Sequence, residues 1–180
     1  MGLDMYLSYR RNLDGIPETI QHAMRKQAYT DRYPHLAEHF NKTGELDDII
    51  DYRTEKGDPY EEELMYWRKA NAIHKFFVDN CAGGVDDCEP VRVTIDALKA
   101  LVERCEEILK SVKSGPDDDE LVIDTDIAKE LLPSQSGFFF GSTEYDEWYI
   151  NDLKETVEAI KPIVEHAELY TDPFIYEASW

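Results

Sequence analysis

The sequence predicts a single α+β domain over residues 1–180, mainly helical, with a small sheet that joins the N- and C-terminal strands. Residues 3–7, Leu-Asp-Met-Tyr-Leu, alternate apolar and polar side chains, as a half-buried strand does. Residues 174–180 alternate in the same way. Two isolated strands each need a partner, so we expect them to lie in one sheet. A chain of this length is long enough to bury one substantial core.

Helical patterns fill the sequence between these strands. Pro17 is tolerated in a first helical turn and predicts a helix over 17–29. One or two short helices are expected over 34–53. The strongest helical pattern covers 60–80 and ends at Gly83-Gly84. Its expected apolar face comprises Leu64, Trp67, Ala70, Ile73 or His74, and Phe77.

The second half predicts one more strand and three more helices. Val91-Arg92-Val93 is a short strand candidate. Thr94 is a suitable N-cap for a helix to about Val112. A short helix near 125–132 is ended by Pro133. The last helix is expected over 143–168, where Pro162 should kink or split it. The expected buried side of the helix after Thr94 comprises Leu98, Leu101, Val102, Cys105 and Leu109.

Three consecutive phenylalanines lie between two glycines, in the segment Gly137-Phe138-Phe139-Phe140-Gly141. A strand would place Phe138 and Phe140 on one face and Phe139 on the other. The segment therefore predicts a buried strand or extended loop, with Ser142 or Thr143 as the N-cap of the next helix. An aromatic wall for a flat ligand is the alternative.

Charge restricts the function classes. The chain has 19 basic and 39 acidic residues, so its formal net charge is 19 − 39 = −20. This excess argues against direct binding to nucleic acid or to an anionic membrane. It favours a basic protein partner, although solubility alone also explains it. The first residues lack the apolar core of a signal peptide, and three cysteines form no disulfide framework, so a cytoplasmic location is expected.

A first candidate site is polar and would bind a small ligand. On a 60–80 helix, Arg68 and Asn71 would lie on one side with His74 or Lys75. His74 and Asp86 would form an acid–base pair in the catalytic version of this site. In the alternative interpretation, Arg68 and Lys75 pair with surface carboxylates and His74 lies at the core margin. The candidate ligand-binding residues are Arg68, Asn71, His74, Gln135, Phe139 and Tyr145.

Neither a metal site nor a cofactor is predicted. His35 and His39 have helical i, i+4 spacing, but no third ligand stands close to them in the sequence. The acidic run 117–120 lacks the glycine and the spaced ligands of an EF-hand loop. We interpret it as a solvated loop.

A second candidate site is a carboxylate surface. Acidic residues recur every three or four positions on the last helix, about 5–6 Å apart. That spacing is comparable to the charge spacing along a nucleic-acid strand. An ordinary solvated helix face is the alternative interpretation. The candidate partner-binding residues are Glu61, Glu62, Glu63, Glu144, Glu147, Glu155 and Glu158.

Several unusual segments occur together: MGLDMYL, YWRKANAIHKFFVDN at 66–80, GGVDDC at 83–88, LLPSQSGFFFGSTEYDEWY at 131–149, and Trp180. With them the chain resembles an uncharacterised family of small proteins encoded by tailed phages, prophages and bacterial genomes. The matching segments cover about a third of the chain. The resemblance implies a genomic setting and no mechanism.

Setting and charge together give the leading functional hypothesis. It is a non-enzymatic accessory protein, acting in the cytoplasm of a host bacterium, that inhibits a nucleic-acid-handling defence complex. An anti-CRISPR or anti-restriction protein that imitates DNA is its concrete form, and a Cas or restriction nuclease with a basic surface is the expected partner. The alternative is a small-ligand, nucleotide-like binding protein or hydrolase. A structural or assembly protein is the third possibility.

Overall fold

The computed structural model describes residues 2–11, 13–32, 34, 60–115, 121–171 and 173–180. These residues belong to two compact units. Unit 1 comprises residues 1–8 and 63–180, and unit 2 comprises residues 9–62. The helices expected over 34–53 and the acidic run 117–120 lie outside the described residues. A single domain over 1–180 stays a prediction.

An α+β fold is confirmed, with the first and last strands in one sheet. The strand order is β2-β1-β6-β3, and their bounds are Glu61–Arg68, Asp4–Arg10, Phe174–Ser179 and Val91–Val93. β3 runs antiparallel to β6, with Val91 opposite Tyr176 and Val93 opposite Phe174. A separate two-stranded ladder joins β4, Lys113–Ser114, to β5, Leu121–Val122.

One face of the four-stranded sheet is buried. Phe174, Tyr176 and Ala178 alternate with more exposed neighbours along β6, as the period-2 pattern predicted. Met5 and Leu7 are fully buried on β1. On the exposed face, the rings of Tyr6 and Tyr66 lie 5.2 Å apart on the neighbouring strands β1 and β2.

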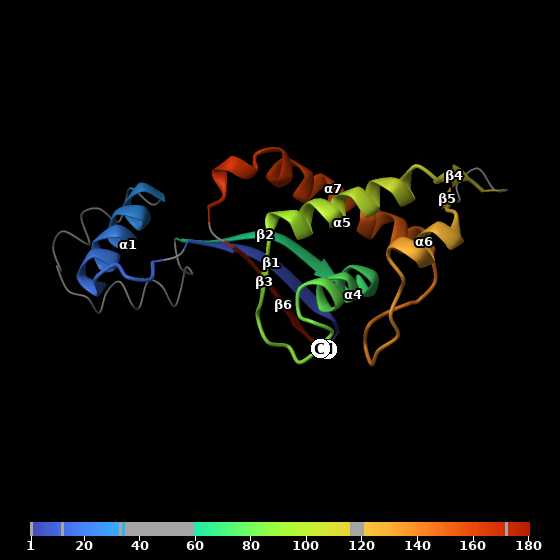
Figure 1. The fold of residues 1–180 in the computed structure, drawn as a ribbon, viewed down its shortest axis with the longest axis horizontal. Helices are drawn as coiled ribbons and strands as arrows, with labels where there is room; N and C mark the ends of the chain where they lie inside the picture. The colour runs from blue at the N-terminus through green and yellow to red at the C-terminus, as the bar shows by residue number, and fades with distance from the viewer. Residues whose placement is uncertain (1, 12, 33, 35–59, 116–120, 172) are drawn as a thin grey trace. The chain divides into compact units, whose positions relative to one another are not determined.

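Helices pack on the buried face (Figure 1). They are α4, Asn71–Asn80; α5, Ile95–Leu109; and α7, Glu147–Glu165. α5 and α7 lie side by side. Trp67 of β2 donates a 2.8 Å hydrogen bond from Nε1 to Thr156 Oγ1 of α7, and the Phe77 ring of α4 stacks on Tyr176 of β6. These contacts fix the helices relative to the strands.

The helix after Thr94 closely follows its prediction. Thr94 Oγ1 accepts from the backbone N–H of Ala97 at 3.2 Å, which satisfies one of the free N–H groups of the first turn. Leu98, Leu101, Val102 and Cys105 are buried as expected. The last residue of the predicted buried side differs: Ile108 is buried there, and Leu109 is only partly covered.

The helix predicted over 60–80 is wrong in its first half. Residues 61–68 form β2, and α4 begins only at Asn71. Lys69 separates them with a φ of 62°, which interrupts any regular element. The apolar spacing of Leu64, Trp67 and Ala70 resembles a helical period, but pairing with β1 and the burial of Trp67 against α7 favour the strand.

The last helix begins later than expected. Asp146, and not Ser142 or Thr143, is its N-cap, because its carboxylate accepts from the N–H groups of Trp148 and Tyr149. α7 continues through Pro162 to Glu165 as one helix, with a short 3-10 turn, η2, at Ala167–Leu169. The short helix expected near 125–132 is α6, Thr125–Leu131.

Unit 2 contains α1, Glu18–Arg32, which the sequence predicted from Pro17. The Pro17 carbonyl accepts from the backbone N–H groups of Ile20 and Gln21 at 2.8 and 3.0 Å. The Gln21 side chain donates to the carbonyls of Leu13 and Ile16, which ties the preceding loop to the helix. None of the described helices combines the length and the apolar character that crossing a bilayer requires.

Candidate functional site

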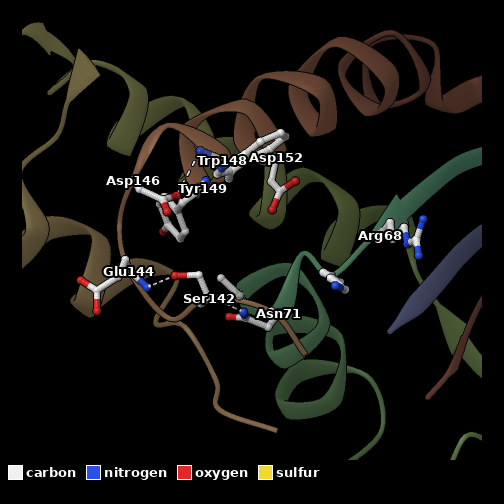
Figure 2. Close-up of a pocket in the computed structure, with 11 residues that line it drawn as sticks. Arg68, Asn71, Ser142, Glu144, Asp146, Trp148, Tyr149 and Asp152 are labelled. Atoms are coloured by element: carbon white, nitrogen blue, oxygen red, sulfur yellow. Dashed lines mark hydrogen bonds between the residues drawn. The ribbon is translucent and has the colours of Figure 1, made fainter. Parts of the chain in front are cut away.

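A pocket of about 620 Å³ opens in unit 1, where the end of β2 and the start of α4 face the start of α7 and the loop before it. Its volume lies within the roughly 300–1,000 Å³ typical of small-molecule sites. Figure 2 shows Trp148 and Asp152 on α7 across from Asn71 and Ser142, with Arg68 at one end and Glu144 at the other. The lining is mixed, with carboxylates, cations, amide and hydroxyl groups, and aromatic rings.

Asp152 is the unusual side chain of this pocket. It is half-buried, and no hydrogen bond or ion pair reaches its carboxylate from the described part of the chain. Burial, followed by the negative charges of Glu155 and Asp146, raises the pKa of the Asp152 carboxyl to about 7. This carboxyl therefore changes its charge near neutral pH while it faces a cavity.

Two aromatic side chains stand beside Asp152. Trp148 lies one helical turn earlier on α7, and its side chain is 77% exposed. Tyr149 is buried and donates from its hydroxyl to the Leu132 carbonyl at 2.8 Å. Burial raises the pKa of the Tyr149 hydroxyl, so it remains a neutral donor. The pocket thus has one fixed aromatic wall and one exposed ring at its opening.

Two cationic side chains, those of Arg68 and Lys69, lie on the β2 side of the pocket, and the backbone of Lys69 is strained. Arg68 is 64% exposed, and its Nε lies 4.0 Å from the Asp4 carboxylate. Lys69 has a φ of 62°, and its N–H donates to the Leu3 carbonyl at 2.8 Å. Gly141 has a φ of 89°, and a Cβ there would lie 3.1 Å from the Lys69 Cβ. The close approach of these two segments therefore depends on glycine at 141.

Asn71 holds the loop that forms the pocket floor. Its Nδ2 donates to the carbonyls of Phe140 and Ser142 at 3.1 and 2.7 Å, and its Oδ1 accepts from the Gln135 N–H at 3.0 Å. The side chain is buried, and these bonds engage both donors and the acceptor of its amide. Asn71 consequently positions residues 135–142 against α4.

The triple phenylalanine forms a turn and not a buried strand. The Phe140 N–H donates to the Gly137 carbonyl at 3.3 Å, and Phe139 has a φ of 73°. Phe140 is 4% exposed, whereas Phe138 is 81% exposed and contacts the Phe139 ring. Core packing therefore explains only Phe140. A Cβ at Gly137 would lie 2.5 Å from the Phe140 ring, which accounts for the first glycine.

His74 belongs to a separate, closed cluster. It is 1% exposed, its Nδ1 lies 2.6 Å from the Tyr176 hydroxyl, and its Nε2 lies 3.1 Å from both Asp86 carboxylate oxygens. The rings of Phe140 and Trp180 contact the imidazole. Burial raises the pKa of the Tyr176 hydroxyl. The adjoining cavity is only about 10 Å³, room for about one water molecule.

Of the six residues predicted for a ligand site, Arg68 and Asn71 line the pocket. His74 does not, although it makes the Asp86 contact that the catalytic version required. Gln135 contributes a backbone N–H to Asn71. Tyr145 accepts from the Ser134 N–H and lines a second depression with Thr125 and Lys129, and Trp148 lines both this depression and the pocket. Phe139 is in the turn.

Sequence reasoning missed Ser142, Trp148 and Asp152 as pocket residues. Trp148 and Asp152 have i, i+4 spacing, which places them on one side of any helix. That spacing was available in the sequence. The position of this pair opposite Arg68 and Asn71 could not be predicted from the sequence, because it depends on how α7 packs against α4 and β2.

The predicted carboxylate surface is distributed over several elements. Glu147, Glu155 and Glu158 are exposed on α7, where Lys154 and Lys161 are exposed too. Lys161 pairs with Glu106 at 2.7 Å. In unit 2, Glu61 pairs with Arg10 at 2.7 Å and Glu62 is exposed. Glu63 is exposed in unit 1, and Glu144 lies at the rim of the pocket.

Within the described ranges, no group of three or more His, Cys, Asp or Glu side chains is arranged to hold a metal ion. Comparison with known proteins gives no relative: no family model matches the chain, and no curated protein or solved structure is significantly similar to it. The fold and the site therefore define the protein only as an α+β protein with a small-molecule-sized pocket.

Proposed function

We propose that this chain is a small-molecule-binding protein whose site is the pocket between β2, α4 and α7. The observation that carries the proposal is a pocket of about 620 Å³ lined by a half-buried carboxylate, Asp152, that has no partner among the described residues. Polar groups removed from bulk water are normally hydrogen-bonded to the protein or to ordered water, which a ligand can replace. A carboxylate that faces a cavity without a partner is therefore poised to bind a ligand.

Two further observations support binding at this place. Of the three described non-glycine residues at positive φ, Lys69 lines the pocket, Phe139 lies in the loop that forms its floor, and Cys88 lies beside the His74 cluster. Such strained conformations cost roughly 1–3 kcal/mol each and concentrate at functional sites. Asn71 uses its whole amide to hold the loop in place, which preorganises the floor before any ligand arrives.

A ligand screen tests the proposal with matched variants. Saturation-transfer NMR would be recorded with pools of nucleotides, amino acids and amines, first on the unmodified protein. We expect hits whose signals disappear in Trp148→Ala and persist both in Phe138→Ala and in Lys129→Ala, since Lys129 lines only the second depression that Trp148 also borders. Both side chains are about four-fifths exposed, and only Trp148 lines the pocket. Hits whose signals are unchanged in both Trp148→Ala and Phe138→Ala, or no hits from any pool, contradict the proposal.

An acidic inhibitor of a host nucleic-acid-handling complex is the second candidate, and one observation favours it. Glu147, Glu155 and Glu158 are exposed on one helix of a chain with net charge −20. Such a surface would be attracted to a basic, nucleic-acid-binding channel. This candidate includes the phage or prophage setting that the sequence segments suggest, with a Cas or restriction nuclease as the partner.

Charge reversal tests this second candidate. A tagged chain would be used to capture proteins from a bacterial lysate at low and high salt. Glu155→Lys with Glu158→Lys should abolish capture of a nuclease complex. The control, Glu103→Lys with Glu130→Lys, makes the same charge change at exposed sites on α5 and α6. Equal loss in both double variants would indicate a net-charge effect and contradict a specific α7 surface.

A further inference from the structure

We propose that the pocket takes a small organic cation, whose ammonium or guanidinium group lies against Asp152 and whose flat body lies against Trp148. This inference rests on the proposed ligand-binding function and names the class of ligand. It differs from the nucleotide-like ligand expected from the sequence, since a nucleotide brings anionic phosphates.

The charge of the lining favours a cation. Three carboxylates line the pocket, those of Glu144, Asp146 and Asp152, against the two cations Arg68 and Lys69. Arg68 is mostly exposed and has the Asp4 carboxylate nearby. Arg68 is the last residue of β2 and Lys69 follows it, whereas Asp152 lies across the pocket on α7 (Figure 2). The surrounding protein has net charge −20, which attracts cations from solution and repels anions.

The geometry on α7 supplies both contacts that such a ligand needs. Trp148 and Asp152 are four residues apart on one helix, so their side chains emerge on the same side with Cβ atoms about 5–6 Å apart. A cation beside Asp152 is then within reach of the indole face, and Trp is the strongest cation–π partner among side chains. The exposed ring also offers a flat surface for an aromatic or aliphatic body.

An ion pair between Asp152 and a cationic ligand would be favourable because this carboxylate has no partner among the described residues. Asp146 uses its carboxylate to cap α7, and Glu144 points away from the centre of the pocket in Figure 2. Asp152 makes no such bond within the described residues. A charge-assisted hydrogen bond from an ammonium group would satisfy a carboxylate that the fold leaves partly desolvated.

A dependence on pH follows from the same groups. The pKa of Asp152 is raised to about 7, so the ionised carboxylate that a cation needs forms only as the pH rises through this value. Affinity for a permanent cation should therefore increase from pH 6 to pH 8.5 by about tenfold, as the ionised fraction rises from about 0.1 to nearly 1. The titratable and charged groups that act on Asp152 or share its pocket are Asp146, the N-cap of α7, Tyr149 and Glu155 on α7, Glu144 on the preceding loop, and Arg68 and Lys69 at the end of β2.

Three indole compounds of matched shape test the proposal by isothermal titration calorimetry. Tryptamine carries an ammonium group that, like that of lysine, stays protonated below about pH 10. Tryptophol is its neutral counterpart, and indole-3-acetate is the anion. We expect tryptamine to bind the unmodified protein at least about tenfold more tightly than tryptophol at pH 8.5, and indole-3-acetate to bind least.

Asp152→Asn should remove this preference and its pH dependence. The variant keeps the size of the side chain but loses the charge, so tryptamine and tryptophol should bind it equally. Glu158→Gln, on the exposed side of the same helix, makes the same charge change outside the pocket and should leave the preference intact.

The possible outcomes separate this inference from the proposed function. Equal or tighter binding of the neutral or anionic indole, lost in Trp148→Ala, overturns the cation assignment and leaves the pocket as a binding site. A preference for tryptamine that survives in Asp152→Asn overturns the role of this carboxylate. No binding by any of the three compounds overturns the organic-cation proposal, while the wider ligand screen decides the proposed function independently.

Discussion

His74 and Asp152 are both ionisable side chains, but His74 is fully buried whereas Asp152 is half-buried and lines a pocket. Each ring nitrogen of His74 has a partner, and three aromatic rings enclose the imidazole. Asp152 has no partner in the described residues and faces a pocket of about 620 Å³. The ring nitrogens of His74 are satisfied within the fold, whereas the carboxylate oxygens of Asp152 are left to bind a group from outside the chain.

This difference teaches where function should be sought. From the sequence, an acid–base pair of His74 and Asp86 was the catalytic candidate. In the structure His74, Asp86 and Tyr176 connect α4, the loop after it and β6, and the adjoining cavity of about 10 Å³ is too small for a substrate. The less familiar combination of Trp148 and Asp152 has both the space and the unsatisfied polar group.

The largest effect is expected from Phe140→Ala. Phe140 is 4% exposed and its ring contacts His74 and Trp180, so truncation leaves a cavity in the closed cluster. Unfolding in urea should show a loss of about 3–4 kcal/mol. Phe138→Ala, in the same turn, should change the free energy of unfolding by less than about 0.5 kcal/mol. Similar losses in both variants would contradict the turn geometry.

A slightly smaller loss, about 3 kcal/mol, is expected for His74→Ala. The change leaves the buried Tyr176 hydroxyl and the Asp86 carboxylate without their partner. Urea unfolding at pH 7 measures it, with the exposed His166→Ala as the control. A loss below about 1 kcal/mol would show that the closed cluster is not structural and would bring His74 back as a candidate functional residue.

Asp152→Asn should stabilise the protein at pH 8 by about 2 kcal/mol, which is the roughly 4 kcal/mol that the raised pKa alone implies, reduced for the partial exposure of the carboxyl. The folded-state pKa of Asp152 is raised, so its ionisation opposes folding, and the protein loses stability as the pH rises from about 4 to about 7. The amide does not ionise. The advantage of the variant should therefore grow over this range and stay constant above it. Thermal unfolding from pH 4 to pH 8 measures it, and an advantage that is the same at all pH values contradicts the shifted pKa.

Much of the fold was predictable, because local patterns and tertiary contacts agree there. The alternation at 3–7 and 174–180 identified two strands and their shared sheet, and Thr94 identified the start of α5. The prediction failed where the local pattern and the tertiary contacts disagree. Residues 61–68 have helix-like spacing, and only the neighbouring strand β1 and the α7 contact of Trp67 make them a strand.

The candidate site was only partly predictable. Arg68 and Asn71 were predicted to line a site from one helix, but Arg68 belongs to β2 and only Asn71 belongs to α4. The pocket depends on the positive φ of Lys69, on the turn at Phe138-Phe139 and on the packing of α7, all of which bring distant segments together. No local pattern in a single sequence encodes those distances. The glutamates predicted for the carboxylate surface on α7 are exposed, but so are Lys154 and Lys161 among them, and partner binding by this surface stays a prediction.

The neighbouring positions of β1 and β6 in the sheet have a consequence for biosynthesis. β1 leaves the ribosome well before β6, yet the order β2-β1-β6-β3 places the two strands side by side at the centre of the sheet. Until β6 emerges, β1 has β2 as its only sheet neighbour and an open edge that can pair with other nascent chains. Contacts of such long sequence separation also slow folding. The central sheet therefore forms late, and chaperone dependence and expression temperature should influence yield more than the stability of the finished protein does.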